Sequence, residues 1–396
     1  MTTAYEFRDV EHAANLFSLK ELGNIYTRLN NPTTDVFEKR FAEIEGGEAA
    51  IATSSGMSAT FFAIANSAEA GDNIVCAQQL YGGSLTLTGH TFKRFGIEAR
   101  FFDVQNPDSM EDLIDDKTKV IFFESLTNPS IDVADIEAIT TIANKHGILT
   151  VVDNTVATPV LCRPFEFGAD ITVHSASKYT TGQGLAIGGI LVERKGLVEK
   201  LKGNPRYAHF NEPDASYHGL VYVDVPLPPF TLRTRLSLLR DIGAVSSPFN
   251  SWLFIQGLEH LSLRMREHSS NALKLAEFLE SHPKVKKVNY PGLKSNSNYA
   301  NAQRYFQDGL CSGLLSFEVA SLDIATKIVD ATELYSLVVN IGDSKSIITH
   351  PASTTHQQLK PAELIACGVP AGLIRISCGL ESSKDLITDL KQALDA

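Results

Sequence analysis

Short apolar runs alternate with amphipathic stretches over residues 36–192 of this 396-residue chain. The runs are rich in β-branched and aromatic residues, and the stretches between them have apolar residues at helical spacing. Buried parallel strands give such continuous apolar runs, and the helices that connect them give the amphipathic stretches. The pattern predicts an α/β fold with a mostly parallel sheet, whose strands are Asn73–Cys76, Glu98–Phe102, Val120–Phe123, Leu149–Val152, Ile171–Val173 and Gly189–Val192.

One stretch between two of these strands carries helix signals at both ends. Residues 135–146 begin with acidic side chains and end with Lys145 and His146, just before Gly147. Acidic groups are favourable at the N-terminal end of a helix and basic groups at its C-terminal end, and glycine commonly follows the last turn. We therefore predict a helix over Asp135–His146.

The pattern changes after Gly203. Residues 204–230 contain several prolines and tyrosines but no periodic element, which predicts an insertion or a boundary loop. A long helical stretch over Ser247–Glu280 then leads to a second set of strands, near Gly313–Val319 and Leu373–Ser377. A chain of 396 residues with 43% apolar content is too long for one hydrophobic core and ample for two, so we expect two domains.

Composition and charge narrow the class of partner. The formal charge of -11 and the pI of about 5.5 leave no basic surface for nucleic acid or anionic lipid. Residues 1–17 lack the basic and apolar regions of a signal peptide, and no stretch approaches the roughly 20 apolar residues of a membrane span. We expect a cytoplasmic protein that binds a small molecule, with neither nucleic acid nor a membrane as partner.

The cysteines predict neither a disulfide framework nor a metal site. They are widely separated, odd in number and without a C-x-x-C pair, which is typical of reduced thiols. No His/Cys cluster has the spacing of metal ligands, so we expect no metal. The cysteines are Cys76, Cys162, Cys311, Cys367 and Cys378.

Asp153 ends the apolar run ILTVVD and is followed by Asn154 and Thr155. In an open parallel sheet, ligands gather beyond the carboxyl ends of the strands, so a carboxylate at this position points toward the expected site. The alternative is an aspartate that only caps a loop or a helix, and for this segment alone that alternative is favoured.

Lys178 follows another short run, DITVH, and shares one turn with Ser175 and Ser177. A solvated surface lysine is the usual alternative. Pyridoxal phosphate, however, requires a lysine amine for its Schiff base, an acid beside its ring nitrogen and donors for its phosphate. Lys178, Asp153 and the two serines match these requirements in turn. The combination predicts a pyridoxal-phosphate site, which neither segment predicts alone.

A second candidate for the phosphate is TSSGMSA, residues 53–59, just before a helical run. Gly56 permits a tight turn, and the N–H groups of Gly56 and Met57 would open a helix N-terminus toward an anion. The alternative is an ordinary serine-capped helix. Tyr81, in QLYGGS, would stack on the cofactor ring, whereas a lone tyrosine more often fills a core or an interface.

Arg375 lies among apolar residues in the strand-like segment LIRISCGLE. A buried guanidinium is unfavourable unless it is paired, and its planar fork fits a substrate carboxylate. A structural salt bridge to an internal aspartate or glutamate is equally compatible with the sequence.

Six segments in this order resemble the Cys/Met-metabolism family of pyridoxal-phosphate enzymes, over essentially the whole chain. The resemblance implies the α/β fold of the aspartate-aminotransferase type (fold type I), with a large cofactor-binding domain over residues 31–245 and a smaller α/β domain over residues 246–396. It also implies an arm, residues 1–30, that contacts a neighbouring subunit of a homotetramer. The segments are YTRLNNPT (26–33), SSGMSA (54–59), YGG (81–83), VVDNT (151–155), HSASKYTTG (174–182) and RISCGLE (375–381).

The resemblance implies a role for each candidate residue. Lys178 would be the Schiff-base lysine and would share the proton transfers with Tyr81 and Tyr26. The substrate would be held by Arg375, Asn128 and Asn340. The cofactor would be held by Asp153, Thr155, Tyr81, Gly56, Met57, Ser175 and Ser177, and by Tyr26 and Arg28 reaching in from a neighbouring subunit.

Two further segments, residues 211–222 and 338–359, resemble the O-acetylhomoserine sulfhydrylase branch. Gly83 stands where methionine γ-lyases commonly have cysteine, while Ser177 and Gln183 stand where the branch often has threonine and histidine. The resemblance implies γ-replacement, in which O-acetylhomoserine and sulfide, a thiol or a sulfur-carrier protein give homocysteine and acetate in methionine biosynthesis. The alternatives are a methionine γ-lyase, a cystathionine γ-synthase or γ-lyase, and a noncatalytic protein that binds pyridoxal phosphate.

Overall fold

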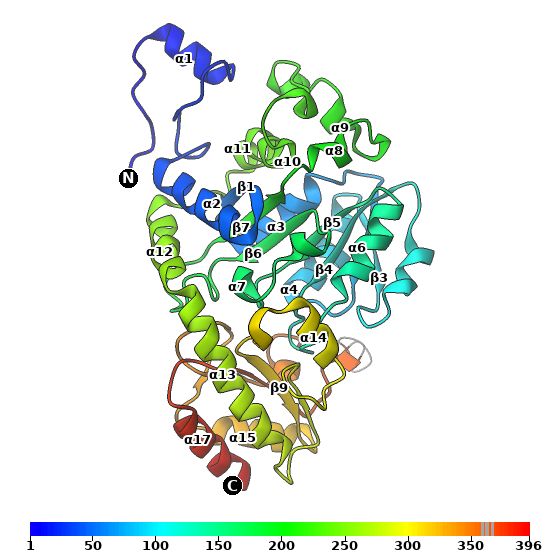
Figure 1. The fold of residues 1–396 in the computed structure, drawn as a ribbon, viewed down its shortest axis with the longest axis vertical. Coiled ribbons are helices and arrows are strands. Elements are labelled where there is room, and N and C mark those ends of the chain that lie inside the picture. The colour runs from blue at the N-terminus through cyan, green and yellow to red at the C-terminus, as the bar shows by residue number, and fades with distance from the viewer. Residues whose placement is uncertain (358–359, 361–363, 366–367) are drawn as a thin grey trace.

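The computed structural model describes residues 1–357, 360, 364–365 and 368–396 (Figure 1). Cys367 and the last two residues of the segment 338–359 lie outside the described residues. The chain forms a larger α/β unit followed by a smaller one, each built on its own sheet. The α/β expectation is therefore confirmed.

The first sheet has seven strands in the order β1-β7-β6-β5-β4-β2-β3. Its strands β2 to β6 are parallel, and β7 is antiparallel to both of its neighbours. All six predicted strands are present. Strand β1 was not predicted, because its sequence GEAAIAT is rich in alanine and poor in the residues that favour strands. The strands are β1 Gly47–Thr53, β2 Asn73–Ala77, β3 Glu98–Phe102, β4 Thr118–Glu124, β5 Leu149–Asp153, β6 Ile171–Ser175 and β7 Gly189–Arg194.

Helices cover both faces of this sheet, as Figure 1 shows. Helix α2 (Pro32–Glu45) packs against Ala50 and Ala52 on one side of β1. Ile51 points to the other side, into the core that includes α3 (Gly56–Ala65). Burial on both faces explains why the central strands are continuously apolar.

The helix predicted over 135–146 is α6 (Ile136–Lys145). Asp135 is its N-cap, where the carboxylate accepts a hydrogen bond of 3.1 Å from the N–H of Ala138. His146 is its C-cap, directly before Gly147. The sequence signals therefore located both ends of this helix.

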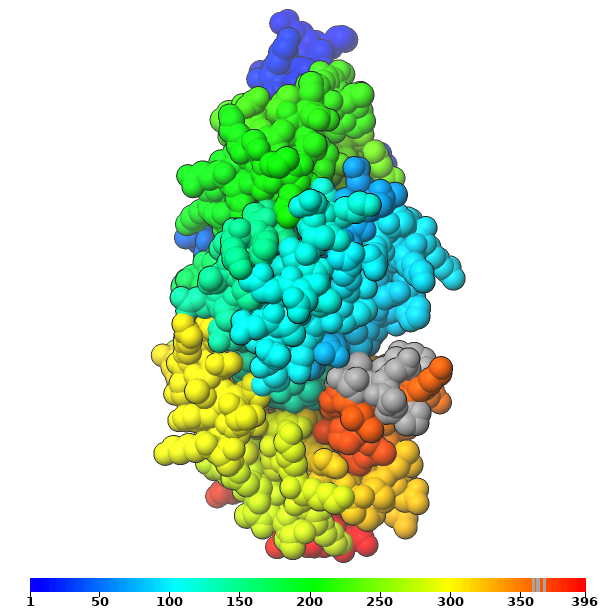
Figure 2. All heavy atoms as spheres, turned by 90° about the vertical axis from the view of Figure 1, so that its right-hand side faces the viewer, coloured from blue at the N-terminus to red at the C-terminus, as the bar shows by residue number. Residues whose placement is uncertain are grey.

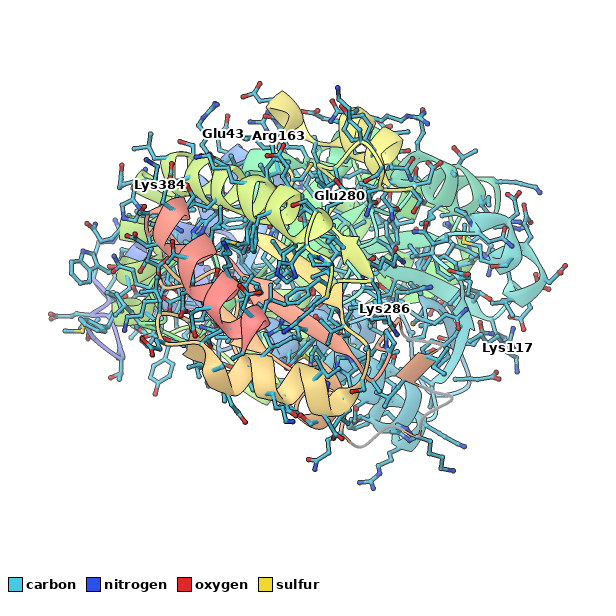
Figure 3. All side chains as sticks on the ribbon, turned by 90° about the horizontal axis from the view of Figure 1, so that it is seen from below. Glu43, Lys117, Arg163, Glu280, Lys286 and Lys384 are labelled. Atoms are coloured by element: carbon cyan, nitrogen blue, oxygen red, sulfur yellow. The ribbon has the colours of Figure 1, made fainter. Side chains whose placement is uncertain are left out.

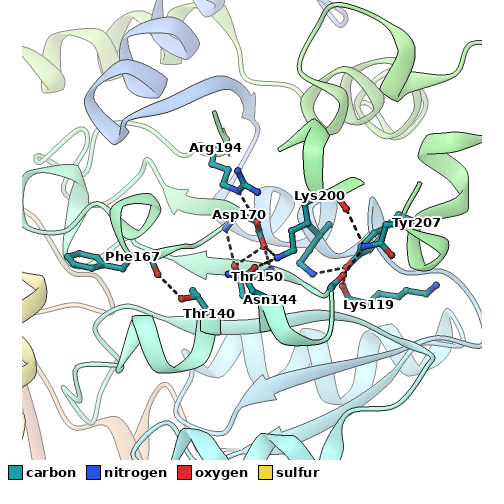
Figure 4. Close-up of polar contacts among 12 residues, drawn as sticks. Lys119, Thr140, Asn144, Thr150, Phe167, Asp170, Arg194, Lys200 and Tyr207 are labelled. Atoms are coloured by element: carbon teal, nitrogen blue, oxygen red, sulfur yellow. Dashed lines mark hydrogen bonds and ion pairs between the residues drawn. The ribbon is translucent and has the colours of Figure 1, made fainter. Parts of the chain in front are cut away.

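A buried charge network holds one end of the sheet together (Figure 4). Asp170 precedes β6, and its side chain is 1% exposed. It accepts hydrogen bonds from Arg194 Nε at 2.9 Å, Lys200 Nζ at 2.6 Å and the N–H of Thr150 at 2.9 Å. A buried carboxylate needs such partners, so Asp170 is a structural acid at the opposite end of β6 from Lys178.

Residues 204–230 are not the featureless loop that the sequence predicted. They form a series of short helical turns, including α9 (Ala208–Asn211), and bury Tyr207, Phe210 and Tyr222. The hydroxyl of Tyr207 donates to the carbonyl of Lys119 at 2.6 Å, which attaches the segment to β4. Single turns are too short to show periodicity, which explains why this prediction was wrong.

The helical stretch predicted over Ser247–Glu280 is two helices, because the backbone breaks at His260. Helix α12 (Pro248–Glu259) packs on α2, where Ser251 and Thr34 hydroxyls lie 3.0 Å apart. Helix α13 (Leu261–Glu280) continues to the second unit. This pair of helices therefore connects the two units.

The second sheet has five strands in the order β10-β11-β12-β9-β8. Strands β10 and β11 are parallel and the other pairs are antiparallel. Helices α13, α15 (Leu322–Ala331) and α17 (Ser383–Asp395) lie side by side on this unit (Figure 3). The strands are β8 Lys287–Asn289, β9 Leu314–Glu318, β10 Ser336–Leu337, β11 Ile347–Thr349 and β12 Leu373–Ser377.

The N-terminal segment 1–30 stands out from the molecule at the end far from the second unit (Figures 1 and 2). It contains α1 (Val10–Phe17), and Val10 and Leu22 are 86% and 70% exposed. The hydroxyl of Tyr217 donates to the carbonyl of Phe17 at 3.0 Å. No helix of the described residues is both long and apolar enough to cross a membrane.

Candidate active site

A cavity of about 430 Å³ opens at the carboxyl ends of strands β4, β5 and β6, where the second unit meets the first sheet. This is the edge at which an open parallel sheet binds its ligands. Most of the predicted site residues line it, although they come from segments far apart in the chain. They are Gly56, Met57, Tyr81, Asn128, Asp153, Thr155, Ser175, Ser177, Lys178, Asn340 and Arg375.

Lys178 lies in the turn after β6, and its Nζ donates a hydrogen bond of 2.7 Å to Oδ1 of Asn340. Burial, together with a smaller effect of the positive charge of Arg375, lowers the pKa of Lys178 from 10.5 to about 8. Desolvation disfavours the charged amine. A substantial neutral fraction near pH 8 gives Lys178 a nucleophilic amine, whereas a solvated surface lysine stays protonated.

The lowered pKa predicts a pH-dependent stability for the ligand-free protein. Below pH 8 the lysine is charged in both states, so its burial penalty, about 3 kcal/mol, is fully present. Between pH 8 and 10.5 the unfolded chain binds more protons, so the stability from this group rises with pH. We expect Lys178→Met to raise the free energy of unfolding at pH 7, and the gain to vanish near pH 10.5. Urea unfolding of both proteins at the two pH values measures it.

Two acids lie at the ends of adjacent strands. Asp153 ends β5, and its Oδ1 accepts a hydrogen bond of 3.0 Å from the N–H of Thr155. Glu124 ends β4 in direct register with Asp153 and is 2% exposed. Burial raises the pKa of both carboxyls, and the charge of Asp153 raises that of Glu124 further. A cationic group bound beside this pair would be strongly favoured.

Sequence reasoning missed Glu124, although a usable signal was present. Glu124 directly follows the apolar run VIFF, in the same way that Asp153 follows ILTVV. The strand-end rule that selected Asp153 therefore also selects Glu124. Thr355 also lines the cavity and was not singled out.

The start of α3 forms an anion cradle against the end of β6. Ser55 is the N-cap and accepts a hydrogen bond of 3.1 Å from the N–H of Ser58. A Cβ atom on Gly56 would lie 2.6 Å from Cβ of Ser175, so only glycine permits this approach. The free N–H groups of the first turn then face the cavity beside Ser175, which is a favourable arrangement for a phosphate.

Ser177 and Thr155 hold the backbone around this cradle. The hydroxyl of Ser177 accepts a hydrogen bond of 2.9 Å from the N–H of Gly188. Oγ1 of Thr155 accepts one of 2.8 Å from the N–H of Ser175. Both side chains line the cavity, so each hydroxyl stabilises the local turn and faces the space beside it.

Arg375 lies in β12 and is 3% exposed. Its guanidinium donates to Oδ1 of Asn128 at 3.0 Å and to the carbonyl of Asn340 at 3.1 Å, while its Nε has no partner. No carboxylate of the described residues lies within 4.0 Å of it, so the salt bridge considered from the sequence is wrong. Burial lowers its pKa to about 10. A buried arginine without a counterion fits a site for a carboxylate ligand.

Tyr81 lies at the mouth of the cavity, with 41% of its surface exposed, directly before α4 (Gly82–Thr86). A Cβ atom on Gly83 would lie 2.5 Å from Cε1 of its ring. The ring therefore rests against Gly83, and a larger residue there would displace it.

Tyr26 and Arg28 do not line this cavity. The guanidinium of Arg28 donates to the carbonyl of Arg240 and lies 5.6 Å from the centre of the Tyr26 ring. Both side chains are exposed. Within one chain they are therefore apart from the other predicted residues, and their part in a neighbouring subunit's site stays a prediction.

The residues present fit pyridoxal phosphate together with an amino acid. The cavity holds an amine of lowered pKa, the buried Glu124 beside the partly exposed Asp153, a helix N-terminus and a buried arginine with an unpartnered Nε. Within the described part of the chain, no group of three or more His, Cys, Asp or Glu side chains could hold a metal ion.

The chain belongs to the Cys/Met metabolism PLP-dependent enzyme family, whose model matches residues 1–395. It is 47% identical over 403 residues to an O-acetyl-L-homoserine sulfhydrylase of Leptospira meyeri, covering 99% of this chain and 90% of the relative. It is 46% identical over 403 residues to a homocysteine/cysteine synthase of Kluyveromyces lactis, covering 98% and 90%.

A solved structure has nearly the same fold. It is a putative O-acetylhomoserine (thiol)-lyase from Campylobacter jejuni, with a TM-score of 0.99, 53% identity and coverage of 100% of this chain and 94% of that one. That structure carries an N'-pyridoxyl-lysine-5'-monophosphate. The expected family, fold type I architecture and dependence on pyridoxal phosphate are confirmed.

Proposed function

We propose that this enzyme converts O-acetyl-L-homoserine and sulfide to L-homocysteine and acetate in methionine biosynthesis. The observation that carries the proposal is the buried guanidinium of Arg375, which lies in the same cavity as Lys178 and has no carboxylate partner among the described residues. This arrangement suits a substrate with an α-carboxylate next to an α-amine. The names of the relatives support O-acetylhomoserine as the substrate and sulfide as the sulfur donor.

Lys178 has two tasks in this proposal. Its amine would hold the cofactor and, when free, would move protons at Cα and Cβ of the substrate. Bound pyridoxal phosphate supplies an electron sink that makes these carbon protons acidic. The pKa of about 8 keeps part of the Lys178 population neutral, as a proton acceptor requires.

The other residues hold the reacting groups in place. Arg375 binds the α-carboxylate, and Asn128 and Asn340 orient the guanidinium from two sides. Asp153 would pair with the ring nitrogen of pyridoxal phosphate, and Tyr81 would stack on its ring. Ser175, Ser177 and the first N–H groups of α3, at Gly56 and Met57, would hold its phosphate.

We further propose that the sites are shared between subunits in the cytoplasm. Residues 1–30 form an arm on a homotetramer, through which Tyr26 and Arg28 reach the phosphate of a neighbouring site. Residues 31–245 form the cofactor-binding domain and residues 246–396 the smaller domain. The exposed apolar residues Val10 and Leu22 on this arm support a subunit contact.

The reaction is tested by offering the holoenzyme O-acetylhomoserine, O-succinylhomoserine or methionine, each with and without sulfide, and identifying products by NMR. We expect homocysteine and acetate only from O-acetylhomoserine with sulfide. A 2-oxo acid and ammonia formed without sulfide would instead identify a γ-lyase. Methanethiol and a sulfur-carrier protein can replace sulfide in the same assay to identify the donor.

Asp153→Asn tests the acid opposite the ring. A hydrogen bond that involves a charged group contributes about 1.5–3 kcal/mol, so we expect the Kd for the cofactor to rise about 10–100-fold. Fluorescence titration of the cofactor-free protein measures it. Asp170→Asn is the matched control, because Asp170 is a buried acid that does not line the cavity. The Asp170→Asn variant should be less stable but should bind the cofactor as tightly as the wild type. Equal cofactor affinity in the two variants would contradict the role of Asp153.

A further inference from the structure

Glu124 connects two loops that carry different parts of the site. Its Oε1 accepts a hydrogen bond of 2.6 Å from the N–H of Tyr81, in the loop after β2. Its Oε2 accepts one of 3.0 Å from the N–H of Asn128, in the loop after β4. Both donors are backbone groups, so Glu124 fixes the position of each loop rather than one side chain.

These loops carry different groups that line the same cavity. The first carries the ring of Tyr81, which rests against Gly83 at the mouth of the cavity. The second carries Asn128, whose side chain accepts a hydrogen bond from Arg375 at 3.0 Å. A shift of Glu124 would therefore move the ring cover and the carboxylate-binding arginine together.

The chemistry of Glu124 is unfavourable for a purely structural residue. It is 2% exposed, no cation of the described residues lies within 4.0 Å of it, and Asp153 is its register partner on the next strand. Burial and the nearby acid raise its pKa. Burying a carboxyl beside a second acid costs free energy. The hydrogen bonds from the N–H groups of Tyr81 and Asn128 offset part of this cost.

We propose that Glu124 is a positioning residue that sets the distance between Tyr81 and the Asn128–Arg375 pair. It does not contact the reacting atoms in this role. The inference rests on the proposed function, because it assigns Arg375 to the substrate carboxylate and Tyr81 to the cofactor ring. It adds that the positions of Tyr81 and of Arg375 both depend on the side chain of Glu124.

Glu124→Gln separates this role from general stability. The amide keeps one carbonyl oxygen but presents an NH₂ group to the second loop, where an N–H donor already points. One loop must move away. Glu193→Gln is the matched control, since Glu193 is also fully buried and accepts hydrogen bonds from the N–H groups of Phe230 at 3.3 Å and Thr231 at 2.9 Å, outside the cavity.

Hydrogen exchange of the cofactor-free protein, read by mass spectrometry, tests the contacts directly. In Glu124→Gln we expect exchange at the amide of Tyr81 or Asn128 to accelerate about tenfold, the loss expected for a hydrogen bond to a charged group. In Glu193→Gln the change should be confined to peptides that contain Phe230 and Thr231. Unchanged exchange around Tyr81 and Asn128 would overturn the proposal, whichever substrate the enzyme uses.

Steady-state kinetics of the holoenzyme provide the second measurement. We expect Glu124→Gln to raise KM for the amino-acid substrate and lower kcat, with kcat/KM reduced about 10–100-fold, because misplaced groups lose orientation. Glu193→Gln should keep KM within about threefold. If Glu124→Gln does not fold, Glu124→Asp replaces it, because a side chain one methylene shorter cannot keep both contacts. Wild-type KM and kcat in the variant that folds would also overturn the role.

Discussion

Lys178→Ala will lower kcat at least 10⁴-fold, the largest effect that we expect from any single substitution, since it removes both the nucleophile and the proton carrier. The variant should also lose the visible absorbance of the lysine-bound cofactor. Both losses follow from the amine of Lys178. Its contact with Asn340 holds it in the cavity, and its pKa of about 8 keeps part of it neutral and therefore reactive.

Lys200→Ala is the control for this substitution. Lys200 is also largely buried, and burial lowers its pKa, but it pairs with Asp170 (Figure 4), and neither residue lines the cavity. We expect it to lose stability and to keep the absorbance. Borohydride reduction of the wild-type holoenzyme, followed by peptide mapping, should label only the peptide with HSASKY. Label on another lysine, or turnover by Lys178→Ala near the wild-type rate, would refute the assignment.

The parts of the fold that were predictable depend on local patterns. The central strands are buried on both faces, so each is a continuous apolar run, and α6 has its cap at Asp135. Strand β1 lacks such a pattern because alanine carries little strand preference. The break at His260 was missed because the residues around it keep helical spacing while the backbone of one residue departs from it.

The site was predictable where a residue type and a strand end coincide, as at Asp153. Two features depend on contacts between distant segments, which no local pattern contains. Arg375 faces Asn128 from a strand of the second sheet, and the sequence left its partner open. Glu124 reaches the loops of Tyr81 and Asn128 at the same time.

Arg375→Met should weaken substrate binding while the stability of the ligand-free protein stays equal or rises. In the presence of substrate, the loss of a buried, two-point contact to the α-carboxylate should reduce kcat/KM about 10²–10³-fold or more, mainly by raising KM and misorienting Cα. In the ligand-free protein the same change removes a buried cation whose Nε has no partner, so thermal stability should stay equal or rise. Arg375→Lys keeps the charge but loses the planar fork, so its kcat/KM should lie between that of the wild type and that of Arg375→Met.

Arg233→Met distinguishes this effect from the loss of any buried arginine. The Nε of Arg233 also lacks a partner, its pKa is also lowered by burial, and its guanidinium holds Asn66 outside the cavity. We expect it to leave KM for the amino acid unchanged. Thermal unfolding without ligand and kinetics with substrate, measured on both variants, decide between the roles. A large loss of stability in ligand-free Arg375→Met, with an unaltered KM, would show that Arg375 is structural. A residue whose role is to bind a carboxylate lowers the stability of the ligand-free protein and raises only that of the ligand-bound protein.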